Sequence, residues 1–247
     1  MVLVMKLISF AWSAYDGQRP DAELDPTQRA SKIDNVPGLI PFLGYAFYFP
    51  SILAGPAFTF KAYQNFVTRS LFAKEMTHKD NKVIKEKTII PPGRRRKAAK
   101  RCLTGVVFLA IYSLYGSKAS YFKMLEPSFQ ERRFAYRFFF MQCCGFLART
   151  KYYAVWCIAE SACIVSGLGY NPATKKYDAS RNVRIRSIEL ATNFKVLFDS
   201  WNMNTNVWLR ECIYKRLAKS GKKPGFKSTQ ITFITSALLV SIPSLPS

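Results

Sequence analysis

Amide side chains gather in one short stretch of the chain. The residues "SWNMNTNVWLRECIYKRL" (200–217) place two tryptophans, three asparagines and a threonine close together, ahead of a helix-like run. Asparagine is a poor helix former, and an amide buried without a partner is destabilising. Two roles fit this concentration. Asn202, Asn204 and Asn206 either cap helices and hydrogen-bond between them, or they form one half of an active site.

The spacing within this stretch predicts a helix. Apolar and polar positions recur at intervals of three and four, which places them on one helical face: Thr205, Trp208, Leu209, Cys212, Ile213 and Arg216. Glu211 and Lys215 stand four residues apart on another face and can form an ion pair. Asp199 or Ser200 is expected to cap the start of the helix.

Other familiar chemistries have no counterpart in the sequence. The chain contains no phosphate-binding loop, no dinucleotide-binding fingerprint and no G-x-S-x-G, and no histidines and cysteines at zinc spacing. Five of the six cysteines lie in apolar stretches, which predicts buried, reduced thiols and no metal site: Cys102, Cys143, Cys144, Cys157 and Cys163. The single histidine, His78, lies in a polar segment and is expected to be solvated.

Long apolar segments must position these residues. Residues 39–60 contain no charge, and a helix of that length would cross a hydrocarbon core of about 30 Å. Pro41, Pro50 and Pro56 make a straight helix implausible, so we expect a kinked or partly re-entrant segment. Residues 102–117 are also uncharged.

Further apolar segments are expected at 134–148 and at 152–170, the second of which contains Glu160. A lone charge at membrane depth usually faces protein or a wet cavity. Glu160 is therefore either a structural partner for a basic group or a substrate-contacting residue. The start of the chain, 1–17, is expected to be the end of a buried helix, and residues from 228 onward begin as a helix that breaks at Pro243.

Basic residues are concentrated between the apolar segments. The formal net charge is +22, and "PPGRRRKAAKR" directly precedes the apolar segment that begins at Cys102. Such a block predicts a cytosolic loop at about 61–101. It is either solvated or in contact with phospholipid headgroups or coenzyme A phosphates. The charge does not interleave with exposed aromatics, which argues against nucleic-acid binding. The predicted fold class is all-α, a polytopic transmembrane helical protein.

Four ordered blocks resemble a known family. "SWNMNTNVWL" is similar to the W-N-x-x-T-x-x-W-L stretch of the membrane-bound O-acyltransferase (MBOAT) superfamily, and the similarity is stronger to fungal lysophospholipid acyltransferases of the endoplasmic reticulum. The segments 47–66, 148–171 and 223–237 resemble other blocks of these enzymes. The resemblance extends over nearly the whole chain.

The resemblance implies an activity and a site. It implies a multi-pass protein of the endoplasmic reticulum membrane that transfers an acyl group from acyl-CoA to a lysophospholipid hydroxyl inside a tunnel. Acyl-CoA is then a co-substrate, and no cofactor or metal is expected. Asn202 matches the family's tunnel asparagine, whose amide can orient a reacting group or donate to developing negative charge. Six further residues are candidates for shaping the tunnel, with packing as the alternative: Trp201, Thr205, Trp208, Glu160, Tyr170 and Asn171.

The family's second site residue has no match here. The resemblance implies a histidine base in an F-W-H-G-like segment soon after Thr235–Ala237, but these residues are followed by "LLVSIPSLPS". We therefore expect a fragment truncated at both ends, with residues 1–237 forming a partial domain and 238–247 a divergent tail. Without the base, little or no acyl transfer is expected. The alternative is a non-catalytic membrane protein that binds lipid or a full-length partner.

Overall fold

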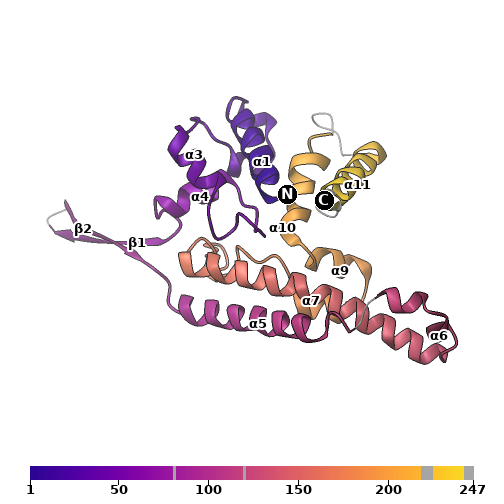
Figure 1. Ribbon diagram of the computed structural model, residues 1–247. Helices are drawn as coiled ribbons and strands as arrows, with labels where there is room; N and C mark the ends of the chain where they lie inside the picture. The colour runs from indigo at the N-terminus through magenta and orange to yellow at the C-terminus, as the bar shows by residue number, and fades with distance from the viewer. Residues whose placement is uncertain (80–81, 119–120, 218–224, 242–247) are drawn as a thin grey trace.

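The computed structural model describes the chain except residues 80–81, 119–120, 218–224 and 242–247. The described part is mostly helical and has one two-stranded hairpin (Figure 1). Its elements, in chain order, are α1 (Val2–Gly17), the 3-10 helix η1 (Asp21–Glu23), α2 (Pro26–Ser31), α3 (Leu39–Ala46), α4 (Phe60–Val67), β1 (Ala73–Lys79), β2 (Lys82–Ile89), α5 (Arg94–Tyr115), the 3-10 helix η2 (Tyr121–Leu125), α6 (Pro127–Gln130), α7 (Phe134–Ser166), α8 (Ile185–Glu189), α9 (Phe194–Ser200), α10 (Met203–Trp208), the π-helix η3 (Leu209–Tyr214) and α11 (Phe226–Ser241).

Two long helices, α5 and α7, pack side by side in antiparallel directions (Figure 1). Gly105 allows the backbones to approach closely, because a Cβ at this position would lie 2.9 Å from the carbonyl oxygen of Ala154. About two turns away, Ser161 Oγ donates to the carbonyl oxygen of Ala98 at 2.9 Å. The pair is thus fixed by a small residue at the crossing and by a hydrogen bond beside it.

The two apolar segments expected at 134–148 and 152–170 are not separate helices, because α7 runs without interruption from Phe134 to Ser166. Arg149 and Lys151 interrupt the apolar pattern, but arginine and lysine are good helix formers. The sequence therefore becomes polar at these positions while the backbone stays helical. The helix ends at Gly167, whose φ of 107° is in the left-handed region that stops helices.

The apolar segment 39–60 is broken, as its prolines predicted. It forms the eight-residue helix α3 and then an irregular stretch that leads into α4. The stretch folds back onto α1: Lys6 Nζ donates to the carbonyl oxygen of Tyr45 at 3.1 Å and to Ser51 Oγ at 2.9 Å. In return, Tyr45 Oη donates to the carbonyl oxygen of Phe58 at 2.8 Å. Buried Lys6 thereby holds α1, α3 and the following stretch together.

The predicted basic loop at about 61–101 contains regular structure, and its location on the cytosolic side stays a prediction. It contains α4, the antiparallel hairpin β1–β2 and the first two turns of α5, which begins at Arg94 directly after the left-handed Gly93. The hairpin is also the one departure from an all-α fold in the described part of the chain. β-branched residues are frequent in "KVIKEKTII" and are compatible with a strand, but the charged residues among them obscured this signal.

One helix in the described part of the chain, α5, is long and apolar enough to cross a membrane. Only 11% of its apolar window is buried, which is unlike the core helix of a soluble domain. The multi-pass topology stays a prediction. α11 continues to Ser241 and so crosses the predicted boundary at 237/238 without a break.

All six cysteines are free. Cys144, Cys157 and Cys163 are buried, as predicted, and so is Cys212. The prediction of burial is wrong for Cys143, which is exposed, and for half-buried Cys102, because both lie on outward faces of α7 and α5. No group of side chains with metal-ligand geometry occurs among the described residues.

Candidate functional site

The asparagine-rich stretch is not one helix. α9 ends at Ser200, Trp201 is extended, and Asn202 takes a left-handed conformation (φ 46°, ψ 49°) before α10 begins. Asparagine tolerates this conformation better than other residues with side chains, apart from aspartate. The predicted caps Asp199 and Ser200 are wrong, because they form the last turn of α9 and Asn202 itself takes the N-cap position of α10.

Asn206 stabilises the turn between the two helices. Its Nδ2 donates to the carbonyl oxygens of Phe198 at 2.7 Å and Trp201 at 2.9 Å. These carbonyls lie at the end of α9, where backbone acceptors have no partner within the helix. For Asn206, therefore, the structural role is the one that the geometry supports.

A second asparagine, Asn182, orients the side chain of Asn202. The backbone N–H of Asn204 can only donate, and it lies 3.0 Å from Asn182 Oδ1. This contact identifies the oxygen of the Asn182 amide, so its other terminus is the NH2 group. That group donates to Asn202 Oδ1 at 3.1 Å, and Thr205 Oγ1 donates to the same oxygen at 2.9 Å.

The result is an amide whose oxygen is occupied and whose nitrogen is not. Within the part of the chain that the structure describes, Asn202 Nδ2 donates no hydrogen bond, and the residue is only half-buried. A fixed, unused N–H pair is the arrangement that stabilises negative charge on a nearby ligand oxygen. Of the three asparagines of this stretch, Asn202 is the one whose amide nitrogen has no partner among the described residues, because those of Asn204 and Asn206 donate hydrogen bonds.

The other candidates of the motif pack around this amide. Trp208 is buried, and its Nε1 donates to the carbonyl oxygen of Met5 on α1 at 3.0 Å. Thr205 is also buried and supports Asn202 directly. Trp201 stacks edge-on against Tyr153 and Trp156 of α7, with ring centroids 6.0 and 5.0 Å away. These three residues hold the turn against α1 and α7.

Glu160 does not contact the asparagine-rich stretch directly and is connected to it only through neighbouring residues. Its side chain is fully buried and accepts from Arg101 Nε at 2.8 Å, while Arg181 Nε is 3.7 Å from its other oxygen. The expectation of a basic structural partner is confirmed. Because Arg181 precedes Asn182, one extended segment links the carboxylate on one side to the asparagine network on the other.

Tyr170 and Asn171 lie apart from the asparagine network. Tyr170 packs against Phe72 and Tyr177, and Asn171 pairs with Lys176 across a tight turn. Asn171 Oδ1 also accepts from the backbone N–H of Ala173 at 3.1 Å, as in an Asx turn. Their contacts are those of a packed loop, and their role in lining a tunnel stays a prediction.

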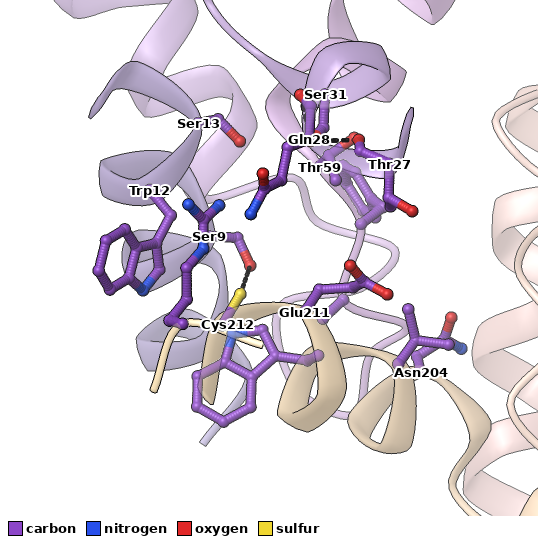
Figure 2. Close-up of a pocket in the computed structure, with 15 residues that line it drawn as sticks. Ser9, Trp12, Ser13, Thr27, Gln28, Ser31, Thr59, Asn204, Glu211 and Cys212 are labelled. Carbon is purple, nitrogen blue, oxygen red and sulfur yellow. Dashed lines mark hydrogen bonds between the residues drawn. The ribbon is translucent and has the colours of Figure 1, made fainter. Parts of the chain in front are cut away.

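A small cavity adjoins the motif on the side of α1 and α2. It has a volume of about 130 Å³, and Figure 2 shows Asn204, Glu211 and Cys212 facing it from below and Ser9 and Gln28 from above. Cys212 Sγ lies 3.6 Å from Ser9 Oγ. Burial raises the pKa of the Cys212 thiol, so this sulfur is a poor candidate for a nucleophile.

Two ion pairs close the cavity between distant parts of the chain. Arg216 forms a bidentate pair with fully buried Asp16 and stacks over Trp12. Lys215 Nζ contacts Asp25 at 3.0 Å and Glu211 at 2.7 Å, so the predicted Glu211–Lys215 pair is confirmed. Partial burial alone would lower the pKa of Lys215, but the two carboxylates raise it.

No imidazole accompanies Asn202 among these 247 residues. The single histidine, His78, lies on β1, and Figure 1 shows this hairpin projecting away from α10. Sequence reasoning also missed Asn182. It stands in the polar stretch "SRNVRIR", and nothing in its neighbours distinguishes it from an ordinary loop asparagine.

Comparison with known proteins places this geometry in context. The model of the MBOAT, or membrane-bound O-acyltransferase, family matches residues 1–239. The chain is 40% identical to the lysophospholipid acyltransferase of Schizosaccharomyces pombe and 36% identical to that of Saccharomyces cerevisiae, in both cases over 96% of this chain. It is 31% identical to lysophospholipid acyltransferase 1 of Arabidopsis thaliana. It spans 46%, 40% and 51% of these relatives, or about half their length.

Proposed function

The chain belongs to the membrane-bound O-acyltransferase family, and from that premise we propose that it serves acyl transfer from acyl-CoA to the hydroxyl group of a lysophospholipid. The names of its relatives support this substrate class. The proposal includes a multi-pass location in the endoplasmic reticulum membrane, with acyl-CoA as the co-substrate.

The observation that carries the proposal is the unused amide of Asn202. Attack of a hydroxyl on a thioester places negative charge on the carbonyl oxygen, and an N–H group fixed in advance lowers the barrier to that step. Asn182 and Thr205 hold the amide oxygen, which leaves Nδ2 to donate. In this proposal Asn202 is the donor, and the cluster around Trp201 keeps the turn rigid.

The second requirement is a base to accept the hydroxyl proton. Imidazole suits this task at neutral pH, and the only imidazole of these residues, His78, is on the hairpin away from α10. We therefore propose that the 247 residues bind the substrates through the amide half of the site and turn them over little or not at all. A non-catalytic lipid-binding role is the alternative that this observation favours.

The test compares two asparagines of the same turn. The purified 247-residue chain and its Asn202→Ala and Asn206→Ala variants are assayed for binding of oleoyl-CoA and lysophosphatidylcholine, and for coenzyme A release that depends on the lysophospholipid. We expect binding without measurable release, weakened about tenfold by Asn202→Ala, as loss of one good hydrogen bond predicts. Asn206→Ala should lower the melting temperature and leave binding by the folded fraction unchanged.

Two results would contradict the proposal. If neither ligand binds, the chain has no part in acyl transfer by itself. If robust release persists in Asn202→Ala, the amide is not the donor and the expectation of an absent base is also wrong.

A further inference from the structure

A continuous groove runs along α5 on a side of the molecule that the asparagine network does not line. It consists of three hollows of 260, 720 and 480 Å³. Neighbouring hollows share lining residues: Arg181 belongs to the first and second, and Phe146 to the second and third. No residue of α9, α10 or the π-helix η3 lines any of them.

The groove changes character along the axis of α5. Its first hollow is basic, with Lys97, Lys175, Lys176 and Arg181 against the single acid Asp178. Its second hollow begins at Arg101 and becomes apolar, lined by Phe108, Phe146, Val183, Ile185 and Leu190 beside the exposed Arg184 and Arg186. The third reaches Tyr115, Phe139 and Leu147.

The acids near the groove leave its basic end positive. Glu160 lies behind the groove wall, fully buried, and holds Arg101 and Arg181 at fixed positions while it neutralises one of them. Further along, Glu189 is neutralised by a bidentate pair with Arg149 at 2.9 and 2.7 Å. Among the described residues, Lys97, Lys175 and Lys176 form no ion pair. Unpaired positive charge is therefore present where α5 begins, and it extends into the second hollow, where Arg184 and Arg186 also form no ion pair among the described residues.

We propose that this groove binds one anionic phospholipid, with its phosphate among Lys97, Lys175, Lys176 and Arg181 and an acyl chain along α5 toward Tyr115. At about 1.5 Å per residue, the apolar part from Thr104 to Tyr115 is about 16 Å long. That length is about half of a ~30 Å hydrocarbon core, which is the depth of one leaflet.

The surroundings of the groove favour a bilayer lipid over a ligand from water. α5 is the helix that satisfies the length and hydropathy of a membrane span, and its apolar side chains beside the groove are exposed: Leu103, Val106, Val107 and Leu109. A lipid could enter sideways with its chain still in an apolar medium. Its headgroup would meet the basic residues where α5 changes from charged to apolar, at Arg101–Cys102. This site is separate from the proposed acyl-transfer site and does not depend on it.

The experiment counts lipids bound to the purified chain in neutral detergent by native mass spectrometry. The probe is dioleoylphosphatidylserine, with dioleoylphosphatidylcholine, free coenzyme A and oleoyl-CoA as separate arms. The key variant is Lys175→Gln/Lys176→Gln, on an exposed loop where folding is at little risk. Its matched control removes the same charge elsewhere, in Lys195→Gln/Lys227→Gln.

We expect one phosphatidylserine to bind tightly, and the Lys175/Lys176 variant to weaken it by about tenfold or more while the control variant does not. Thr104→Trp, which fills the middle of the groove, should weaken the dioleoyl lipid and leave its short-chain dihexanoyl counterpart unaffected. Equal binding to the two double variants would overturn the proposal. So would displacement of the lipid by free coenzyme A, which would make the basic end a site for a soluble phosphate. Preference for oleoyl-CoA over phosphatidylserine would assign the groove to the acyl donor and would equally overturn it.

Discussion

Asn202 illustrates how a network of amides can give one member a free donor. Each contact in the chain Asn204 to Asn182 to Asn202 has a defined direction, because it begins at a backbone N–H that cannot accept. Thr205 adds a second donor to the same oxygen. The Asn202 amide is thus oriented by a residue 20 positions earlier in the chain. At this scale Asn182 orients Asn202, and a contact of Asn202 with substrate stays a proposal.

Replacing Asn182 by alanine should destabilise the chain and release Asn202. Asn182 is buried, and its loss leaves the Asn204 N–H without a partner, so we expect the free energy of unfolding to fall by about 1–3 kcal/mol. Thermal unfolding followed by tryptophan fluorescence in detergent measures this.

A double-mutant cycle with Asn202→Ala separates positioning from simple packing. Because the two side chains share a hydrogen bond, their effects should be coupled by about 0.5–3 kcal/mol. Strictly additive effects would mean that Asn182 does not orient Asn202.

The elements of this chain are positioned mainly by the α5–α7 pair. The pair packs closely at Gly105 and gives the segment 181–190 a surface to lie on, through contacts such as Arg101 with Val183. This segment in turn presents Asn182 to the motif. The close packing of α5 and α7 therefore determines the position of the Asn182 amide, although Asn182 belongs to neither helix.

The same substitution, glycine to alanine, is expected to have opposite effects at two positions of the α5–α7 helix pair. Gly105→Ala should lower the melting temperature, because its Cβ would meet the Ala154 carbonyl oxygen at 2.9 Å and Ile158 Cγ1 at 2.7 Å. Gly145→Ala should raise it slightly, because its Cβ meets Arg149 Nη1 at 3.4 Å and Tyr121 Oη at 3.7 Å without a clash, and alanine favours helix by up to about 1 kcal/mol. Melting curves of the two variants in the same detergent provide the comparison. An increase in both would show that the helices are not in close contact at Gly105.

On the scale of the whole molecule, the first helices are fastened to the last third of the chain. Met5 contacts Trp208, Asp16 pairs with Arg216, and Asp25 pairs with Lys215. Figure 1 accordingly shows α1 beside α10. These contacts join residues 190 to 203 positions apart, so the motif depends on the N-terminal helices for its shape.

The ion pair of Asp25 makes this contact between the first helices and the last third of the chain dependent on pH. Partial burial alone would raise the pKa of Asp25, but the backbone N–H of Gln28 and the ammonium of Lys215 lower it below 3.8. A carboxylate with a lowered pKa stabilises the fold above its ordinary pKa, and this stabilisation is lost as the pH falls below about 3.8.

The prediction concerns the difference between the wild type and Asp25→Asn. Asparagine still caps α2, so only the ion pair is lost, and for a partly exposed pair the difference should be no more than about 1 kcal/mol at pH 6–7. The difference should decrease as the pH falls below about 3.8 and vanish once the pH is below the lowered pKa of the folded state, as measured by thermal unfolding across pH. Asp199→Asn, which changes an exposed pair on α9, is the control. A difference that stays constant down to acid pH would assign the effect to capping.

The sequence by itself determined the helical character, the broken segment at 39–60 and the packing face of the motif. Each of these follows from local composition: uncharged runs, prolines, and a spacing of three and four that places Thr205, Trp208 and Cys212 on one side. The resemblance to the acyltransferase family also depended on local blocks, and the match over residues 1–239 confirms it. The secondary structure of the basic segment was harder to predict, because its charged residues obscured the β-branched residues of the hairpin strands.

Only the tertiary structure decided which asparagine is free and what surrounds Glu160. Asn202, Asn204 and Asn206 are the same residue type at the same local spacing, so their own pattern does not rank them, and only the family resemblance singled out Asn202. The distinction comes from Asn182, which reaches the motif because α5 and α7 place the intervening segment there. Likewise, Arg101 and Arg181 reach Glu160 from 59 and 21 positions away. Hydrogen bonds between distant residues depend on the packing of whole helices, and that information is not local to any stretch of the sequence.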